Sequence, residues 1–146
     1  MNTKLPKAIL SDIDGTISDR RHRLHFIEGK KDWDAFFESL IDDPVIQTTV
    51  DKISEILIDD VELIFVTGRP EKYRSLTEDW ITKNTPFKKY ELYMRRNKDF
   101  RKDVIIKKEM LDDINMSYEV SLVFEDQQQL CDMWSGEGLE CFKIEQ

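Results

Sequence analysis

Two aspartates separated by one residue end a short apolar stretch near the start of the chain, in the sequence AILSDIDGT of residues 8–16. Alternate side chains of a strand point the same way, so Asp12 and Asp14 are predicted to project together, with Gly15 allowing a turn. Two carboxylates this close repel each other and raise one pKa unless a cation lies between them. Such oxygen ligands suit Mg²⁺ that also holds a phosphate. A capping Asp followed by a turn Asp is the alternative.

A second polar feature closes the most apolar stretch of the chain. It is Thr67-Gly68-Arg69, followed by a proline that favours the start of a helix. The hydroxyl and the backbone N–H groups beside the glycine can donate to a phosphate oxygen, close to a helix N-terminus that favours anions. Taken alone, the same residues form an ordinary connection between a strand and a helix.

Two further features complete a possible phosphate site. Lys107, in RKDVIIKKEM, can neutralise phosphoryl oxygens, and Glu125-Asp126 can add carboxylates to the ligand set of a metal. Each has a simple alternative, because helix lysines are usually solvated and acidic pairs often cap a helix. All four features are predicted at strand ends or helix starts of one rim, which favours a shared role in chemistry.

The elements that must position these residues alternate between strands and helices. Apolar stretches predict five strands, at residues 7–12, 61–67, 90–94, 119–124 and 140–144. Helical patterns lie between them, at residues 45–58, 70–83, 103–114 and 126–134. This alternation predicts an α/β fold with a five-stranded, mainly parallel sheet flanked by helices. Ligands of such folds bind at the carboxyl ends of the strands.

The interval between the first two predicted strands is longer than one crossover requires. It contains a basic stretch and an aromatic helix of residues 32–40, DWDAFFESL. We predict that residues 18–42 form a small, cap-like helical insertion over the carboxyl edge, within a single domain of residues 1–146. Most of its aromatic side chains are expected to form its own core, and stacking on a base is the alternative. These side chains are Phe26, Trp33, Phe36 and Phe37.

Composition limits the classes of function. The chain has 146 residues, enough for one domain, and a formal net charge of −8, which argues against a broad surface for nucleic acid. Lysines and arginines nevertheless cluster in residues 20–31 and 88–102. Cys131 and Cys141 are too few for a disulfide framework or a four-ligand zinc site, so we predict two reduced thiols. With no signal-like start or membrane-length apolar stretch, we expect a soluble, cytoplasmic protein.

The four features occur in the order of the motifs of the haloacid dehalogenase (HAD) superfamily, and the chain resembles its phosphatases over essentially its whole length. The stretches HRLHFIEGKKDWDAFF, MRRNKDFRKDVIIK and VFEDQQQLCDMW look like the phosphatase domain of phage-type polynucleotide kinase/phosphatases and its free-standing relatives. The resemblance implies a Rossmann-like HAD fold. Its RxDxxxK spacing places Arg101, Asp103 and Lys107 in register, so Lys108 is not the expected catalytic lysine. At residues 125–126 this chain has Glu-Asp where those relatives usually carry two aspartates.

The resemblance also implies a mechanism. Asp12 attacks phosphorus and forms an aspartyl-phosphate, while Asp14 protonates the leaving oxygen and later takes a proton from the attacking water. Thr67, Gly68 and Lys107 neutralise the charge on the equatorial oxygens.

Mg²⁺ is the implied cofactor. Asp12, the backbone carbonyl of Asp14, and Asp126 are its expected direct ligands. The longer Glu125 side chain is expected to reach the metal through water.

The two basic stretches are predicted to border the mouth of the site, because they follow the first and third strands. The residues expected to bind substrate are Gly68, Arg69, Arg21, Arg23, Arg95 and Arg101. Phosphorylated nucleic acid ends, in particular a terminal 3′-phosphate, are the expected substrates. A nucleotidase acting on nucleoside monophosphates and a catalytically silent HAD-like binding module are the alternatives. No GxxxxGK[ST] motif occurs, so these residues encode no kinase, and the oligomeric state stays open.

Overall fold

Five strands form a single sheet in the computed structural model, which describes residues 4–58 and 60–146. They are β1 (Lys7–Ser11), β2 (Val61–Pro70), β3 (Glu91–Arg95), β4 (Glu119–Glu125) and β5 (Glu140–Lys143). Their order is β3-β2-β1-β4-β5 and every neighbouring pair is parallel. The predicted α/β sheet is confirmed. The domain predicted over residues 1–146 includes residues 1–3 and Asp59, which lie outside the described residues.

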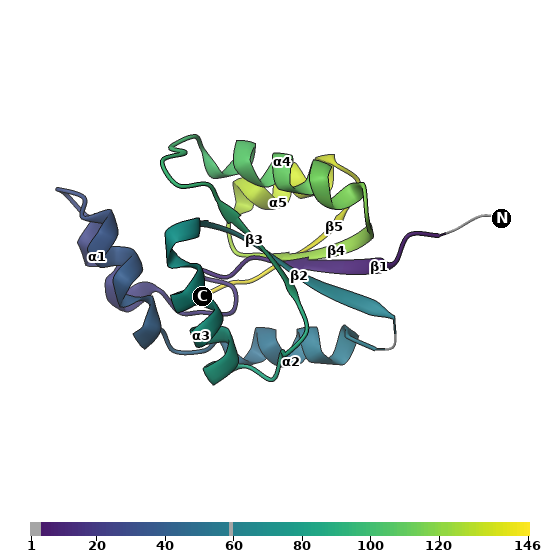
Figure 1. The fold of residues 1–146 in the computed structure, drawn as a ribbon, viewed down its shortest axis with the longest axis horizontal. Helices are drawn as coiled ribbons and strands as arrows, with labels where there is room; N and C mark the ends of the chain where they lie inside the picture. Colours follow the sequence, from purple (N-terminus) through teal and green to yellow (C-terminus); the bar gives the residue numbers. More distant parts are fainter. Residues whose placement is uncertain (1–3, 59) are drawn as a thin grey trace.

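Four helices cover the two faces of this sheet (Figure 1). They are α2 (Gln47–Ile56), α3 (Arg74–Asn84), α4 (Asp103–Asn115) and α5 (Gln128–Gly136). Alternate residues of a strand enter different cores: Ile9 and Phe65 pack on the side of α2 and α3, whereas Leu10 and Ile64 pack on the side of α4 and α5. Burial on both faces explains the continuous apolar stretches. No helix of the described residues is both long and apolar enough to cross a membrane.

The register of the central strands brings the polar motifs to one edge. Ser11, the last residue of β1, lies opposite Phe65 of β2 and Phe124 of β4. The residues that follow these three positions all lie toward the same end of the sheet. Sequence segments more than 50 residues apart are thereby placed around one site.

The second motif lies in a strand rather than at a helix start. We predicted a helix from residue 70, but β2 continues to Pro70, which pairs with Arg95 of β3 beyond an irregularity in the register. Pro70 has extended dihedral angles, φ −64° and ψ 148°, and a short 3₁₀ turn, η3 (Glu71–Tyr73), precedes α3. Gly68 and Arg69 therefore belong to the strand end, and the argument from a helix N-terminus does not apply to them.

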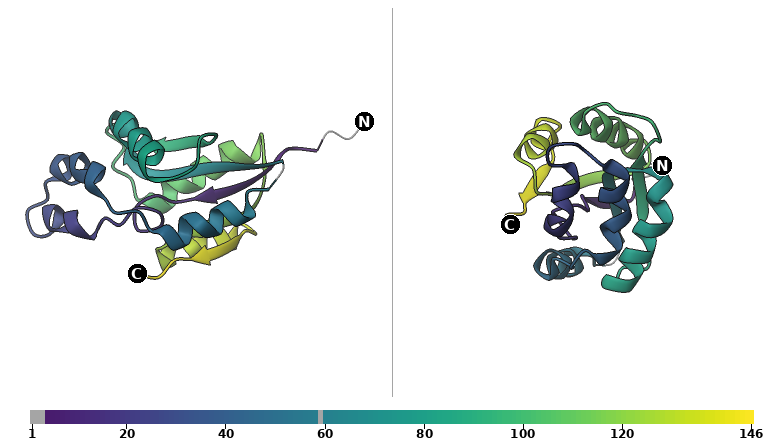
Figure 2. Two further views of the ribbon diagram at one scale, coloured as in Figure 1. Left: turned by 90° about the horizontal axis from the view of Figure 1, so that it is seen from below. Right: turned by 90° about the vertical axis from the view of Figure 1, so that its left-hand side faces the viewer.

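The insertion between β1 and α2 is helical, as predicted. It contains η1 (Arg21–Ile27), α1 (Trp33–Glu38) and η2 (Ser39–Asp42). Asp32 caps α1 by accepting a hydrogen bond from Ala35 N, 3.1 Å away. The insertion projects beyond the carboxyl end of the sheet, away from the N-terminus (Figure 2). Of its four aromatic side chains, Phe36 is buried, Phe26 and Phe37 are half-buried, and Trp33 is exposed.

Cys131 of α5 and Cys141 of β5 form a disulfide, so the prediction of two reduced thiols was wrong. The chain turns back directly after α5, and β5 packs beside that helix. This places the two Cα atoms 5.6 Å apart, a usual distance for a disulfide. The number of cysteines alone did not reveal this contact, because it depends on how the helix and the strand pack.

Candidate active site

A buried lysine joins the first and last motifs at the carboxyl end of β1. Asp12 continues the sheet, since its N–H donates to Phe124 O of β4 at 2.9 Å. Lys107 Nζ, from α4, donates to Asp12 Oδ1 at 2.8 Å and to Glu125 Oε1 at 3.1 Å. The other Asp12 oxygen accepts a hydrogen bond from Thr16 Oγ1 at 3.2 Å. The structure thus brings together Asp12, Lys107 and Glu125, as the motif order predicted.

Burial and neighbouring charges determine the proton affinities of this cluster. Burial, with repulsion from Glu125, raises the pKa of Asp12 well above its usual value, and the Lys107 ammonium only partly opposes this. Burial by itself disfavours a charged lysine, but the Asp12 and Glu125 carboxylates hold the pKa of Lys107 above its usual range. Lys107 is accordingly a permanent ammonium beside the expected nucleophile.

Asp126 supplies the third carboxylate of a group that fits a metal ion. Oxygens of Asp12, Glu125 and Asp126 all lie within 4.8 Å of one another. Asp126 Oδ1 is buried without a hydrogen-bond partner among the described residues, and burial raises the pKa of Asp126 to about 6. Both Glu125 oxygens, in contrast, accept hydrogen bonds from the protein. An unpartnered carboxylate oxygen beside other carboxylates is a suitable hard ligand for Mg²⁺.

Gly15 provides the space that Asp126 occupies. Its φ of +80° lies in the left-handed region, and a Cβ built on it would collide with the Asp126 side chain. The turn is closed by a hydrogen bond from Gly15 N to Ser18 O at 2.8 Å. The glycine of the first motif therefore serves both the turn and the approach of the acidic residue from β4.

Asp14 faces two arginines instead of the metal cluster. Arg23 Nη2 donates to Asp14 Oδ1 at 2.5 Å, and Arg69 donates through Nη2 at 2.7 Å and through Nε at 3.1 Å. Both guanidinium groups are fully buried. Burial would raise the pKa of Asp14, but the charges of Arg69 and Arg23 hold this pKa well below its usual range.

Asp43 completes this group, and sequence analysis assigned it no role. It accepts hydrogen bonds from Arg23 Nε at 2.8 Å and Nη2 at 2.7 Å, and Arg69 Nη2 lies 3.6 Å from its Oδ2. The carboxylates of Asp14 and Asp43 thus alternate with the guanidinium groups of Arg23 and Arg69. The only signal in the sequence was Asp43-Pro44 before a helix, which we interpreted as a helix start. Thr16, whose hydroxyl donates to Asp12, was likewise noted only as the last residue of the stretch AILSDIDGT.

The remaining residues of the second motif line or support the site. Thr67 is buried, and its Oγ1 accepts a hydrogen bond from Arg69 N at 3.1 Å. Gly68 lines the pocket, and its carbonyl accepts from Arg95 Nε at 2.8 Å. A Cβ at Gly68 would lie 2.6 Å from Asp103 Oδ1, so no larger residue fits without movement. Phosphate binding by Thr67 and Gly68 stays a prediction.

All five arginines expected to bind substrate have partners within the protein. Arg23 and Arg69 are buried against Asp14 and Asp43, outside the pocket lining, and Arg95 lines the pocket but donates to Gly68 O. Arg21, at the start of η1, is exposed and binds Asp19 at 2.7 Å, outside the pocket lining. The 3₁₀ turn directs Arg23, two residues later, into the protein instead. Arg101 lines the pocket, but its guanidinium group binds Asp99 at 2.8 Å and Glu109 at 2.7 Å. The structure therefore does not bring Arg21 to the site. Arg101 forms part of the pocket wall, where Asp99 and Glu109 hold its guanidinium group.

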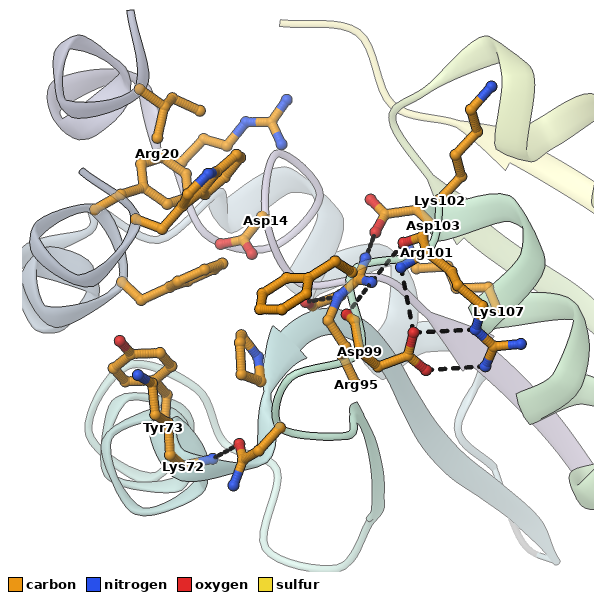
Figure 3. Close-up of a pocket in the computed structure, with 18 of the residues that line it drawn as sticks. Asp14, Arg20, Lys72, Tyr73, Arg95, Asp99, Arg101, Lys102, Asp103 and Lys107 are labelled. Carbon is orange, nitrogen blue, oxygen red and sulfur yellow. Dashed lines mark hydrogen bonds and ion pairs between the residues drawn. The ribbon is translucent and has the colours of Figure 1, made fainter. Parts of the chain in front are cut away.

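A pocket of about 800 Å³ lies above Asp12 and Lys107. Its walls come from the insertion, the end of β2, and the loop between β3 and α4 (Figure 3). Arg20 lies on the insertion side, with its Nη2 3.6 Å from Asp126 Oδ2. Sequence analysis placed Arg20 in a basic stretch but not among the site residues. Further cationic side chains line the pocket: Lys72, Arg95, Lys98 and Lys102.

In comparisons with known proteins, residues 6–146 match the family model described as the polynucleotide kinase PNKP phosphatase domain. A putative bifunctional polynucleotide kinase/RNA ligase of Autographa californica nuclear polyhedrosis virus is 30% identical over 135 residues. That alignment covers 90% of this chain and 18% of the viral protein.

Solved structures agree with this match. A chain in the Pnkp1/Rnl/Hen1 RNA repair complex is 30% identical with a TM-score of 0.79, and the alignment covers 98% of this chain and 43% of that one. The class C acid phosphatase from Bacillus anthracis shares the fold alone, with a TM-score of 0.71 at 14% identity over 98% of this chain and 68% of its own. The chain spans less than half the length of the viral and RNA repair relatives.

Proposed function

Because this chain belongs to the polynucleotide kinase PNKP phosphatase domain family, within the HAD-type phosphoester hydrolases, we propose that it removes terminal 3′-phosphate from nucleic acid ends in an Mg²⁺-dependent reaction. The observation that carries the proposal is the buried contact of Asp12 with Lys107 at the floor of a pocket, beside the unpartnered oxygen of Asp126. This arrangement combines a nucleophile, a fixed cation and a carboxylate suited to a metal.

Asp12 carries out the first chemical step in this proposal. One of its oxygens attacks phosphorus, the bond from phosphorus to the leaving 3′-oxygen breaks, and an aspartyl-phosphate forms. Lys107 and the backbone N–H groups near Gly68 neutralise charge on the phosphoryl oxygens. Water then attacks the aspartyl-phosphate, releases inorganic phosphate and regenerates Asp12.

Asp14 exchanges protons in both steps. Arg23 and Arg69 favour its carboxylate form, which is the form that accepts a proton from the attacking water. To protonate the leaving oxygen, Asp14 must first gain a proton, and a dianionic phosphate entering the pocket raises its pKa in that direction. The two arginines also keep its carboxylate in one orientation.

Asp12 and Asp126 would hold Mg²⁺ directly, together with the backbone carbonyl of Asp14. Glu125 would act through water, because its own oxygens are engaged by Lys107, Trp134 and the backbone N–H of Asp126. When bound, the metal polarises the phosphoryl group and offsets the repulsion among the carboxylates.

The nucleic acid substrate is supported by the relatives and by the pocket. The relatives are described as a polynucleotide kinase/RNA ligase and as part of an RNA repair complex, which favours RNA ends. The pocket is large enough for a nucleotide, and cationic side chains line it on several walls. We propose phosphorylated nucleic acid ends as the binding partners.

Phosphate release from a substrate panel tests the proposal. The panel contains RNA and DNA oligonucleotides with a 3′- or a 5′-phosphate, and nucleoside 3′- and 5′-monophosphates, each with and without MgCl₂. We expect the highest kcat/KM for a 3′-phosphorylated oligonucleotide and no turnover without a divalent cation. Higher kcat/KM for the monomers would instead identify a nucleotidase.

Thermal unfolding tests the metal site without activity. Mg²⁺ at 100 times its dissociation constant should stabilise the protein by about 2.7 kcal/mol. The Asp126→Asn variant should lose most of this stabilisation, whereas Asp132→Asn, in the exposed part of α5, should retain it. An equal response of the two variants to Mg²⁺ would exclude Asp126 as a ligand.

A further inference from the structure

Two aromatic side chains that the mechanism does not use line the active-site pocket. Phe100, between β3 and α4, is 92% exposed, the highest value among the large hydrophobic side chains of the described residues. Trp33, the first residue of α1, is 48% exposed. Single exposed apolar residues are common on protein surfaces and need no explanation. These two differ because both line the pocket that has Asp12 and Lys107 at its floor.

The two aromatic residues belong to different walls of this pocket. Figure 3 shows Arg20 and Tyr73 on one side, and Asp99 and Arg101, the neighbours of Phe100, on the other. Trp33 belongs to the first wall, because its helix α1 is part of the insertion that also carries Arg20. A ligand that extends from Asp12 toward the pocket opening therefore passes between these walls.

The loop that carries Phe100 has a fixed backbone. Arg95 Nη1 donates to the carbonyl oxygens of Asp99 at 2.9 Å and Arg101 at 2.6 Å, on either side of Phe100. The Arg101 guanidinium group also binds the Asp99 carboxylate at 2.8 Å. Because this backbone is already ordered, contact of the Phe100 ring with a ligand costs little conformational entropy. The loop presents an apolar ring to the pocket without covering it.

Trp33 ends a row of packed aromatic rings on the other wall. Its ring stacks on Phe37, with centroids 6.0 Å apart and planes inclined by 23°. Phe37 in turn packs on Tyr73, 5.1 Å away, whose hydroxyl donates to Asp34 at 2.5 Å. Phe37 and Tyr73 thus support one side of the Trp33 ring and leave part of that ring exposed. Phe37 packs against the buried core. The exposed part of the Trp33 ring, with Lys31 Nζ 5.7 Å from its centroid, is available for a ligand.

The size and the charge of the pocket indicate the kind of ligand. About 800 Å³ is far more than one phosphate group needs and is typical of sites that enclose a whole small molecule. Lys98 and Lys102 line the pocket beside Phe100, and neither pairs with an acidic side chain of the described residues. Aromatic rings combined with cations are the surface that proteins use for unpaired nucleotides.

We propose that Trp33 and Phe100 hold the base of the 3′-terminal nucleotide while its phosphate lies over Asp12, an inference that rests on the function proposed above. Every base has a π face, so this contact adds affinity with little sequence preference. A base held between two side chains is not paired with another strand. The enzyme should therefore act on single-stranded or frayed ends and should disfavour a 3′-phosphate at a paired, blunt end.

A double-mutant cycle tests this proposal, in which the aromatic side chain and the terminal base are removed separately and together. Steady-state kinetics would compare a 3′-phosphorylated single-stranded oligonucleotide with one whose terminal nucleotide lacks its base. For the complete substrate, Phe100→Ala and Trp33→Ala should each lower kcat/KM by about 5- to 100-fold, mainly through KM, as expected for the loss of one stacking contact. For the abasic substrate the loss should be less than about 2-fold, because the partner is already missing.

Matched variants identify the cause of any loss. Phe100→Tyr keeps the ring and should retain most of the wild-type kcat/KM. Met116→Ala removes another exposed apolar side chain, 79% exposed at the far end of α4, and should behave as the wild type on both substrates. Equal losses on the complete and abasic substrates, or no loss on either, would overturn the base site. If the wild type prefers monophosphates over oligonucleotides, the proposed function fails first, and the base site fails with it.

Discussion

The two aspartates of the first motif are two residues apart, yet their surroundings are opposite. Asp12 lies with two other carboxylates and one lysine, and burial raises its pKa. Asp14 lies against two buried arginines, which hold its pKa below the usual range. One site has an excess of negative charge that suits a cation, and the other has its negative charge fully compensated.

This difference shows how one fold gives two nearby carboxylates different electrostatic surroundings. Asp12 directly follows β1, at a place where α4 supplies Lys107 and the residue after β4 is Asp126. Asp14 is two residues further along the chain, inside the turn that Gly15 allows. There the insertion supplies Arg23 and β2 supplies Arg69. Two residues along the chain past the end of β1 therefore suffice to replace the neighbours of Asp12 by those of Asp14.

The largest expected effect is the loss of the proposed nucleophile. Asp12→Asn keeps the shape of the side chain but removes its charge, so kcat for a phosphomonoester should fall by about 10³-fold or more. Phosphate release and trapping of the aspartyl-phosphate would measure this. Asp19→Asn is the matched control, because Asp19 lies outside the pocket lining. Hydrolysis by Asp12→Asn near the wild-type rate would contradict the mechanism.

The second effect concerns stability on the Asp12 side. Lys107→Met leaves Asp12 and Glu125 buried without their shared cation, so the free energy of unfolding should fall by about 3 kcal/mol or more. Urea unfolding at neutral pH without metal would measure it. Lys108→Met removes the neighbouring lysine, which binds Asp112 on the exposed face, and should cost about 1 kcal/mol or less. Similar losses in both variants would show that the buried ion pairs of Lys107 contribute no more to the free energy of unfolding than the exposed pair of Lys108.

The third effect concerns orientation on the Asp14 side. Arg69→Lys keeps a positive charge but cannot donate through two nitrogens to Asp14, so kcat/KM should fall by about 10- to 100-fold. Arg74→Lys is the control, because Arg74 makes a similar paired contact with Glu71 at the surface. If Arg69→Lys retains full activity, charge alone explains the effect of this arginine on Asp14.

The smallest effect is expected at the surface of the insertion. Arg21→Ala should change kcat/KM by less than about 2-fold, because the Arg21 side chain binds Asp19 away from the pocket. Arg20→Ala is the contrasting variant, since Arg20 lines the pocket and approaches Asp126. The same substrate panel measures both. A larger loss for Arg21 than for Arg20 would reverse this assignment.

The amino-acid sequence by itself determined the α/β sheet and the helical insertion, and it identified the candidate catalytic motifs. Strands buried on both faces have continuous apolar stretches, and the order of the polar motifs along the chain identifies their shared edge. Asp12 and Asp126 were predicted because each follows a strand that ends at that edge, and Lys107 was predicted from the RxDxxxK spacing of the family that the chain resembles. These are local signals, readable over a few residues.

Only the tertiary structure decided which partners the charged side chains found. Arg21 and Arg23 look equivalent in the sequence, but a 3₁₀ turn directs one to solvent and the other to Asp14. Asp43, interpreted as a helix start, and Phe100 were assigned no place in the site, since the contacts of Asp43 and the pocket around Phe100 depend on segments 20 or more residues away. The Cys131–Cys141 contact depends on packing. Electrostatic energies change steeply over a few ångströms and with burial, so these partners follow from positions in space rather than from spacing along the chain.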